Sequence, residues 1–191
     1  MNPKKGQFKP VIASPGESTP LVSRGDRMAL NEFVKAAPTA YGPNGAAARE
    51  SIARIGKASG GIKRGTQMYR ALSGTDLSSV SGMKPGDSYT LDSPRSVTSA
   101  AGLADVGKFA KEGGTGAAPR NAVAEIEAMH DISGISRVNQ FLHASRPGQV
   151  EGLDSEGLIG HGTRLQLREH TPGLDGSPDV YRFQAYNPEK D

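Results

Sequence analysis

The sequence predicts an α+β fold, with mainly antiparallel sheets and helices packed to one side. Its 191 residues include 25 glycines and 13 prolines, and so many turn-forming residues favour short elements over a helix bundle. Apolar residues recur at helical spacing before residue 60, and the period then changes towards the alternation of strands after residue 64. Helices and strands therefore fall into separate blocks, which is typical of the α+β class.

The first block predicts two helices after a flexible tail. Residues 1–20 are rich in Pro, Gly, Ser and Lys and offer little to bury. Apolar side chains follow a helical period over 24–37, where Pro38 ends the pattern, and again over 45–59, which a glycine pair ends. The predicted organisation is a tail at 1–20 and one domain over 21–191, with a helical layer at 24–60 and a sheet core at 64–187.

The second block predicts short strands with one helix inserted. Alternating or β-branched stretches bounded by Gly, Pro and Asp mark each strand. The segment 131–152 has only weak periodicity, and loops of that length are usually functional or mobile. Strands are expected at about 66–72, 87–91, 93–99, 121–129, 163–169 and 180–186, and a short helix at 100–114.

Composition excludes several classes of protein. No apolar run approaches the roughly 20 residues needed to span a bilayer, and the N-terminal residues lack the apolar stretch of a signal peptide. We therefore expect a protein without membrane association that acts in the cytoplasm of the producing or the target cell. The absence of cysteine excludes disulfides, thiolate catalysis and cysteine-ligated zinc.

Charge is unevenly distributed along the chain. Residues 1–70 contain 12 Lys and Arg against 4 Asp and Glu, whereas residues 71–191 contain 11 against 16, so the two parts carry +8 and −5. The basic part could meet nucleotide phosphates, nucleic acid or an acidic protein surface. A solvated tail followed by basic helix faces explains the same pattern.

Familiar phosphate, metal and hydrolase motifs are missing. There is no GxxxxGK[ST] loop, no GxGxxG, no HExxH and no GxSxG. The histidines lack the spacing of metal ligands on a regular element, so no metal site is expected. They stand at positions 130, 143, 161 and 170.

Three motifs remain, in a fixed order. "MYRAL" places Arg70 on a predicted strand, and "SPRSVTSA" places Ser96 on a Ser/Thr-rich strand that precedes a predicted helix. "DSEGLIGHGTRLQL" places Glu156 seven residues before Thr163, and Asp154 two residues before Glu156. Since residues two apart on a strand share a face, both carboxylates point the same way if 154–156 is extended.

In this order the motifs resemble those of the mono-ADP-ribosyltransferases of the arginine–serine–glutamate class, found among bacterial toxins and phage-encoded enzymes. The resemblance covers about residues 64–170. It implies two mainly antiparallel sheets that form an NAD cleft, covered by an N-terminal helical layer. It also implies NAD as the substrate, with no metal.

The resemblance assigns a role to each matched residue. Arg70 holds the NAD phosphates, which suits a planar guanidinium that grips phosphate oxygens bidentately. Ser96 orients the catalytic glutamate, and Thr98 completes the polar lining of that strand. Glu156 faces the positive charge that builds on the ribose as the nicotinamide leaves. Taken singly, these residues also fit a solvated arginine, a helix-capping turn and a turn glutamate.

Position 154 departs from the family pattern. Arginine-modifying relatives have Glu there and others have Gln, whereas this chain has the shorter Asp154. Its carboxylate is expected to engage the incoming acceptor. The geometry of attack depends on where this carboxylate lies to within about an ångström, so the shorter side chain leaves the identity of the acceptor open. The acceptor is either a protein group or a nucleic acid.

The predicted function is transfer of ADP-ribose from NAD to a macromolecular target, by a phage-encoded or bacterial effector that acts on host components. Two alternatives share the fold. One is an NAD glycohydrolase, in which water replaces the acceptor. The other is a non-catalytic NAD-binding or virion-associated module.

Overall fold

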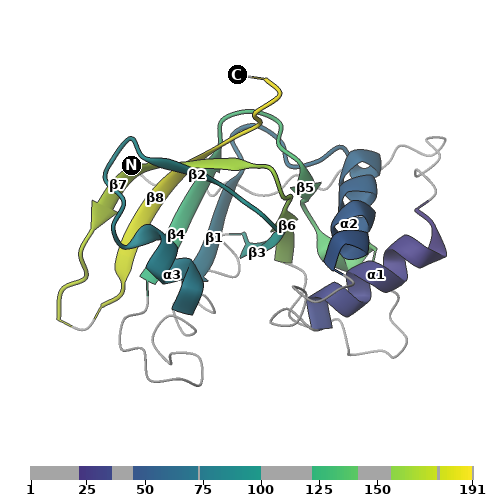
Figure 1. Cartoon of the computed structure of the whole chain (residues 1–191), viewed down its shortest axis with the longest axis horizontal. Helices are drawn as coiled ribbons and strands as arrows, with labels where there is room; N and C mark the ends of the chain where they lie inside the picture. Colours follow the sequence, from purple (N-terminus) through teal and green to yellow (C-terminus); the bar gives the residue numbers. More distant parts are fainter. Residues whose placement is uncertain are drawn as a thin grey trace, which may run out of the picture.

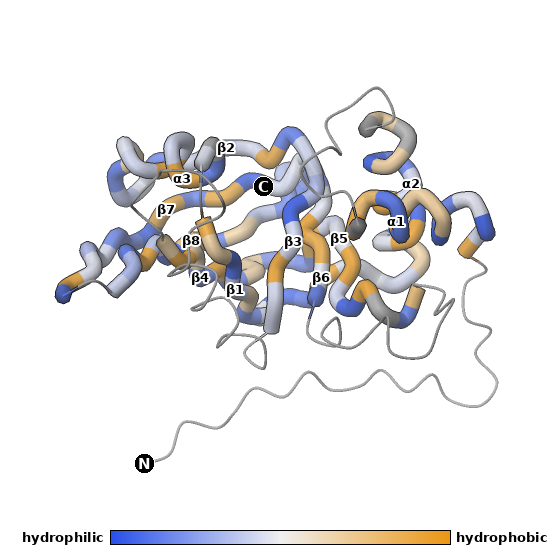
Figure 2. Tube along the Cα trace, turned by 90° about the horizontal axis from the view of Figure 1, so that it is seen from below, coloured by the Kyte–Doolittle hydropathy of each residue, from blue (hydrophilic) through white to orange (hydrophobic). Residues whose placement is uncertain are grey.

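The computed structural model describes residues 22–35, 45–72, 74–99, 122–141, 156–175 and 177–190. Its elements, in chain order, are α1 (Arg24–Lys35), α2 (Gly45–Ser59), β1 (Gln67–Leu72), α3 (Gly74–Val80), β2 (Ser88–Thr90), β3 (Arg95–Thr98), β4 (Ala122–Ala128), β5 (Gly134–Ile135), the 3-10 helix η2 (Val138–Gln140), β6 (Glu156–Ile159), β7 (Arg164–Thr171) and β8 (Asp179–Tyr186). Helices α1 and α2 lie together at one end, next to β5, and α3 lies apart from them (Figures 1 and 2).

The described strands form one eight-stranded sheet in the order β2-β7-β8-β4-β1-β3-β6-β5. Neighbouring strands are antiparallel except β4 and β8, which run parallel. The predicted class, α+β with mainly antiparallel strands and a separate helical layer, is confirmed.

The sheet has a narrow junction where two sheets were predicted. Strand β1 pairs with β4 along its whole length, but its only registered pair with β3 is Tyr69 opposite Thr98. One part of the sheet, β2-β7-β8-β4-β1, therefore meets the other, β3-β6-β5, over a very short contact. The two expected sheets are therefore connected through this contact into a single hydrogen-bonded sheet.

Two main apolar cores lie on opposite faces of the β3–β6 pair. The larger is built from the strands of both parts, with Val80 of α3 packed into it. The smaller lies under the helical layer, where Leu30 of α1 and Ile55 of α2 meet Leu158 of β6, all with 0% exposure. Because Leu158 stands two residues after Glu156, the helical layer fixes the strand that begins at Glu156.

Helix α2 packs directly on the backbone of β5. A Cβ added at Gly56 would lie 2.6 Å from the carbonyl oxygen of Gly134, closer than real Cβ contacts allow. Gly134 itself has φ 148°, a conformation that favours glycine. The helical layer can approach the sheet this closely because Gly56 lacks a side chain, whereas a Cβ at Gly134 would lie too close to the Leu158 carbonyl oxygen of β6.

The two helices of this layer are held together by a charged contact. The Ser23 hydroxyl accepts a hydrogen bond from the Asp26 backbone N–H at 3.1 Å, which caps α1. The Asp26 carboxylate accepts two hydrogen bonds from Arg54 of α2, at 2.7 and 3.0 Å. The Arg54 hydrogen bond lowers the pKa of Asp26 from its usual value, which keeps the carboxylate ionised.

Most elements in the described ranges lie where the sequence predicts them, namely α1, α2, β1, β2, β3, β4, β7 and β8. Helix α3 was not predicted, since "GTDLSSV" is short and has little apolar periodicity. Strand β5 has only two residues, too few for a pattern, and the predicted loop 131–152 also contains η2. The predicted tail 1–20 and helix 100–114 lie outside the described residues. No helix in the described ranges combines the length and apolarity needed to cross a membrane.

Candidate active site

Arg70 lies on β1 between two core residues. Met68 and Leu72, two positions away on the same face, are 2% and 3% exposed. The Arg70 side chain is 23% exposed, and its Nη1 donates a 2.8 Å hydrogen bond to the Ser96 carbonyl oxygen. Its Nη2 forms an ion pair with Asp76 of α3. Arg70 is therefore an oriented, partly buried guanidinium that crosses the junction between β1 and β3.

Ser96, Thr98 and Glu156 share one face of the β3–β6 pair. Thr98 stands directly opposite Glu156, and Ser96 stands two residues earlier on β3. Side chains of opposed residues, and of residues two apart, lie on the same face of an antiparallel pair. The Ser96 hydroxyl hydrogen-bonds the Glu156 carboxylate across the two strands.

The Glu156 carboxyl group is partly desolvated. Burial raises the pKa of Glu156 above its usual value, and the hydrogen bond from Ser96 partly offsets this effect by stabilising the carboxylate. A carboxylate with an altered pKa and one specific hydrogen-bond partner is a common feature of catalytic sites.

Ser96 connects the other two predicted residues. Its backbone carbonyl accepts from Arg70, and its side chain donates to Glu156. In the described part of the chain, Arg70 and Glu156 thus meet through Ser96. The structure brings together the three groups that the sequence motifs single out, from three different strands.

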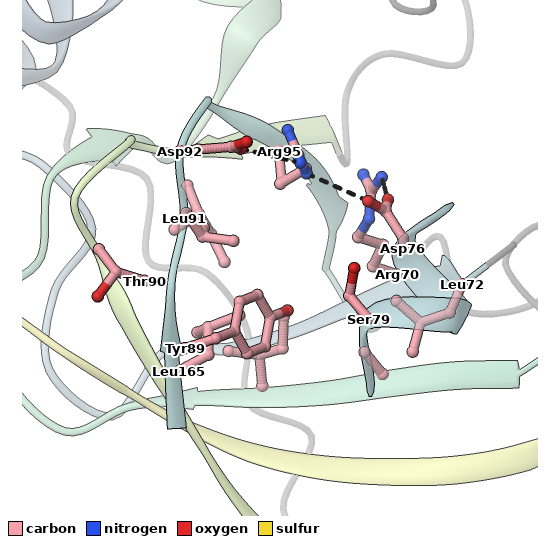
Figure 3. Close-up of a pocket in the computed structure, with 13 residues that line it drawn as sticks. Arg70, Leu72, Asp76, Ser79, Tyr89, Thr90, Leu91, Asp92, Arg95 and Leu165 are labelled. Atoms are coloured by element: carbon pink, nitrogen blue, oxygen red, sulfur yellow. Dashed lines mark hydrogen bonds and ion pairs between the residues drawn. The ribbon is translucent and has the colours of Figure 1, made fainter. Parts of the chain in front are cut away.

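A cavity of about 260 Å³ lies on the other face of β3, between α3, β2 and the sheet. Arg70, Asp76 and Arg95 form its polar mouth, and apolar side chains such as Leu72 and Leu165 form its floor (Figure 3). Pockets that enclose a whole ligand of drug size usually measure roughly 300–1,000 Å³. This cavity is therefore smaller than a pocket that encloses a whole ligand of that size.

Not every predicted residue lines this cavity. Its described lining includes Arg70 but not Ser96, Thr98 or Glu156, because alternate residues of β3 and β6 point to opposite faces. The predicted NAD cleft therefore stays a prediction: in the described residues Arg70 lines the cavity, and the Ser96–Glu156 pair lies on the opposite face of β3 and β6.

Tyr89 of β2 is partly buried and lines the cavity. Burial, followed by the nearby Asp76 carboxylate, raises the pKa of Tyr89 to about 12. Its ring packs edge-on against Phe183, with the ring centroids 6.0 Å apart. Tyr89 therefore stays neutral and keeps its proton as a hydrogen-bond donor.

Sequence reasoning missed two charged residues at the mouth of the cavity. Asp76 lies on α3, the helix that was not predicted, and it contacts both Arg70 and Arg95. Arg95 stands directly before Ser96 in the quoted motif, but the motif does not select it. The available signal was the alternation of β3, which turns Arg95 to the opposite face from Ser96.

Asp154 lies outside the described residues, as do the stretches 100–121 and 142–155. Among the described residues, no group of three or more His, Asp or Glu side chains could hold a metal ion.

Sequence comparisons give no family: no family model matches the chain, and no curated protein matches it. Comparison with solved structures defines the fold, which is that of the mono-ADP-ribosyltransferases.

Three solved structures illustrate the likeness. C3stau2 from S. aureus with NAD is 13% identical, with a TM-score of 0.58 over 88% of this chain and 90% of that one. The Vis toxin, an ADP-ribosyltransferase from Vibrio splendidus, is 12% identical, with a TM-score of 0.57 over 88% and 76%. Exoenzyme S from Pseudomonas aeruginosa, bound to carba-NAD and human 14-3-3 protein beta, is 12% identical, with a TM-score of 0.58 over 88% and 76%.

Proposed function

We propose that this chain is an NAD-dependent mono-ADP-ribosyltransferase, which cleaves the nicotinamide–ribose bond of NAD and transfers ADP-ribose to a macromolecular target. The observation that carries the proposal is the double role of Ser96, whose carbonyl accepts from Arg70 and whose hydroxyl donates to Glu156. The fold supports it, since the C3stau2 and exoenzyme S structures contain NAD and carba-NAD.

Glu156 is the proposed catalytic residue. Departure of nicotinamide leaves positive charge on the ribose, so a fixed carboxylate next to it stabilises the transition state more than the ground state. The Ser96 hydroxyl holds one carboxylate oxygen and leaves the other to accept from the ribose 2′-hydroxyl. Thr98, opposite Glu156, extends the polar lining on the same face.

Arg70 is the proposed phosphate-binding residue. Its guanidinium is held by the Ser96 carbonyl and lines the cavity mouth. A guanidinium stays charged at all physiological pH values and presents a fork of donors that matches phosphate oxygens. No metal ion is required in this scheme, because the guanidinium carries the compensating charge.

Asp154 is proposed to act on the acceptor. If β6 continues by two residues in extended form, its carboxylate lies on the same side as that of Glu156. It could then orient the attacking group of a protein or a nucleic acid. The structural neighbours named above include the Vis toxin and exoenzyme S. The remaining part of the proposal is that the chain is a phage-encoded or bacterial effector that acts on host components in the cytoplasm.

The test is incubation of the chain with NAD labelled in its adenylate part and with cell lysate. The proposal predicts label on macromolecules, and parallel treatment with nuclease or protease shows which kind. Consumption of NAD without transferred label would instead indicate a glycohydrolase. Binding of NAD without release of nicotinamide would indicate a non-catalytic module, and would overturn the proposed transfer.

A further inference from the structure

One carboxylate is shared by two arginines at the mouth of the cavity. Asp76 Oδ2 contacts Arg70 Nη2, and Asp76 Oδ1 lies 3.5 Å from Arg95 Nε. Figure 3 marks the contact of the aspartate with each of the two guanidinium groups by a dashed line. The side chains are 24%, 23% and 16% exposed, so these charges interact in a less polar medium than surface charges do.

We propose that Arg95 grips the pyrophosphate of NAD together with Arg70, and that Asp76 occupies this place until the phosphates displace it. This inference rests on the proposed function. The two oxygens of a carboxylate are spaced much like two oxygens of a phosphate, so the position of Asp76 marks where an anion contacts both guanidinium groups. A pyrophosphate brings more charge and more acceptor atoms than one carboxylate.

Arg95 is placed for this role by the alternation of β3. It stands opposite Ile159 of β6, and both side chains line the cavity. Its neighbour Ser96 points to the other face and holds Glu156. Phosphate binding by Arg95 therefore couples, through one strand, to the position of the catalytic pair.

Asp76 can leave without disturbing the core. It lies in the first turn of α3, whereas the helix is anchored by Val80, which is fully buried, and by Leu77. A change of side-chain rotamer removes the carboxylate from both arginines while the helix stays in place. Arg95 then retains a contact with Asp92, whose side chain is 78% exposed, at 3.2 Å.

A purely structural role for Asp76 predicts the opposite result. If the carboxylate served only to orient the arginines, its removal would weaken NAD binding, because the guanidinium groups would lose their positions. If the carboxylate competes with phosphate, its removal strengthens NAD binding. The sign of the change in affinity separates the two roles.

The experiment measures the affinity of NAD and of ADP-ribose by calorimetry for the unaltered chain, Arg95→Gln, Arg95→Lys and Asp76→Asn. We expect Arg95→Gln to lower the affinity for both ligands about tenfold or more, which is the usual effect of losing a charged hydrogen bond. We expect Arg95→Lys to lower the affinity less. We expect Asp76→Asn to tighten both ligands several-fold. Circular dichroism confirms that each variant is folded.

The matched controls are Arg182→Lys and Glu125→Gln. Arg182 and Glu125 form an ion pair in which Nε and Oε2 are 2.8 Å apart. The pair lies on the opposite face of the sheet from the cavity residues Ala124 and Ile126. They should leave both affinities unchanged. Weaker binding by Asp76→Asn, or unchanged binding by Arg95→Gln, would overturn the inference. If the unaltered chain still binds NAD, that outcome does not contradict the proposed function. No NAD binding by the unaltered chain would overturn both.

Discussion

The Ser96 hydroxyl donates a hydrogen bond to the Glu156 carboxylate across the β3–β6 pair. The bond joins two residues that are 60 positions apart in the sequence. It fixes the carboxylate at the point where β1, β3 and β6 meet, next to the carbonyl that accepts from Arg70. The chemistry proposed for this chain depends on that placement.

Replacing Ser96 by Ala should shift the pH dependence of nicotinamide release. The hydrogen bond from Ser96 lowers the pKa of Glu156, so its loss raises that pKa and leaves less carboxylate at a given acidic pH. We expect lower turnover, NAD binding that remains measurable, and an acidic limb displaced to higher pH. Ser88→Ala, at an exposed position of β2, is the control. An unshifted acidic limb in Ser96→Ala would contradict the assigned role.

Replacing Glu156 by Gln should change stability in a pH-dependent way. The folded state raises the pKa of Glu156, so it binds the proton more tightly than the unfolded chain does. Well below pH 4.5, the usual pKa of a glutamate, Glu156 is protonated in both states and burial of its charge costs no stability. Above the raised pKa of the folded state, Glu156 is ionised, and the folded protein bears the full cost of burying that charge. We expect the variant to be more stable than the unaltered chain at pH 7 and to lose this advantage in acid. Urea unfolding at several pH values measures it, and an advantage that grows in acid would contradict the sign.

Replacing Arg70 by Lys should weaken NAD binding about tenfold or more, because a point charge replaces the fork that phosphate oxygens match. The substitution also removes the 2.8 Å bond to the Ser96 carbonyl. Calorimetry of NAD binding tests this, with Arg182→Lys as the control for loss of a guanidinium elsewhere. Equal affinity in the Arg70 variant and the unaltered chain would remove Arg70 as the phosphate-binding residue.

Replacing Leu30 by Ala should destabilise the fold by about 2–5 kcal/mol, the usual cost of a cavity at a fully buried leucine. Leu30 packs in the same core as Leu158 of β6. The loss of unfolding free energy therefore measures how much the helical layer stabilises the strand that carries Glu156. Urea unfolding gives the free energy. Met28→Ala, at a position 54% exposed on the same helix, is the control. A loss below about 1 kcal/mol for Leu30→Ala would show that the layer does not support the sheet as described.

The sequence predicts much of this arrangement because its strongest signals are periodic. Leu30 and Phe33 stand three residues apart, as do Ile52 and Ile55, and α1 and α2 form where this helical spacing indicates. Strand alternation likewise places Arg70 between Met68 and Leu72, two buried residues on the same face of β1. A charged residue between two core positions is itself a sign of a special environment.

The remainder of the site depends on contacts between distant segments. Nothing in "GTDLSSV" indicates that Asp76 will meet Arg70 and Arg95, since the contact exists only after α3 packs on the sheet. The single registered pair between β1 and β3 is equally invisible in the sequence. Local patterns predict elements, whereas the junction that positions Ser96 results from their packing.

The most direct test of the central claim compares nicotinamide release from NAD by the unaltered chain and by Glu156→Gln, with the exposed Glu169→Gln as a charge-matched control. The variant keeps the shape of the side chain but loses the negative charge that faces the ribose. We predict a loss of at least about 100-fold in Glu156→Gln, as when one preorganised electrostatic group is removed, with none in Glu169→Gln. Turnover by folded Glu156→Gln equal to that of the unaltered chain would contradict the account.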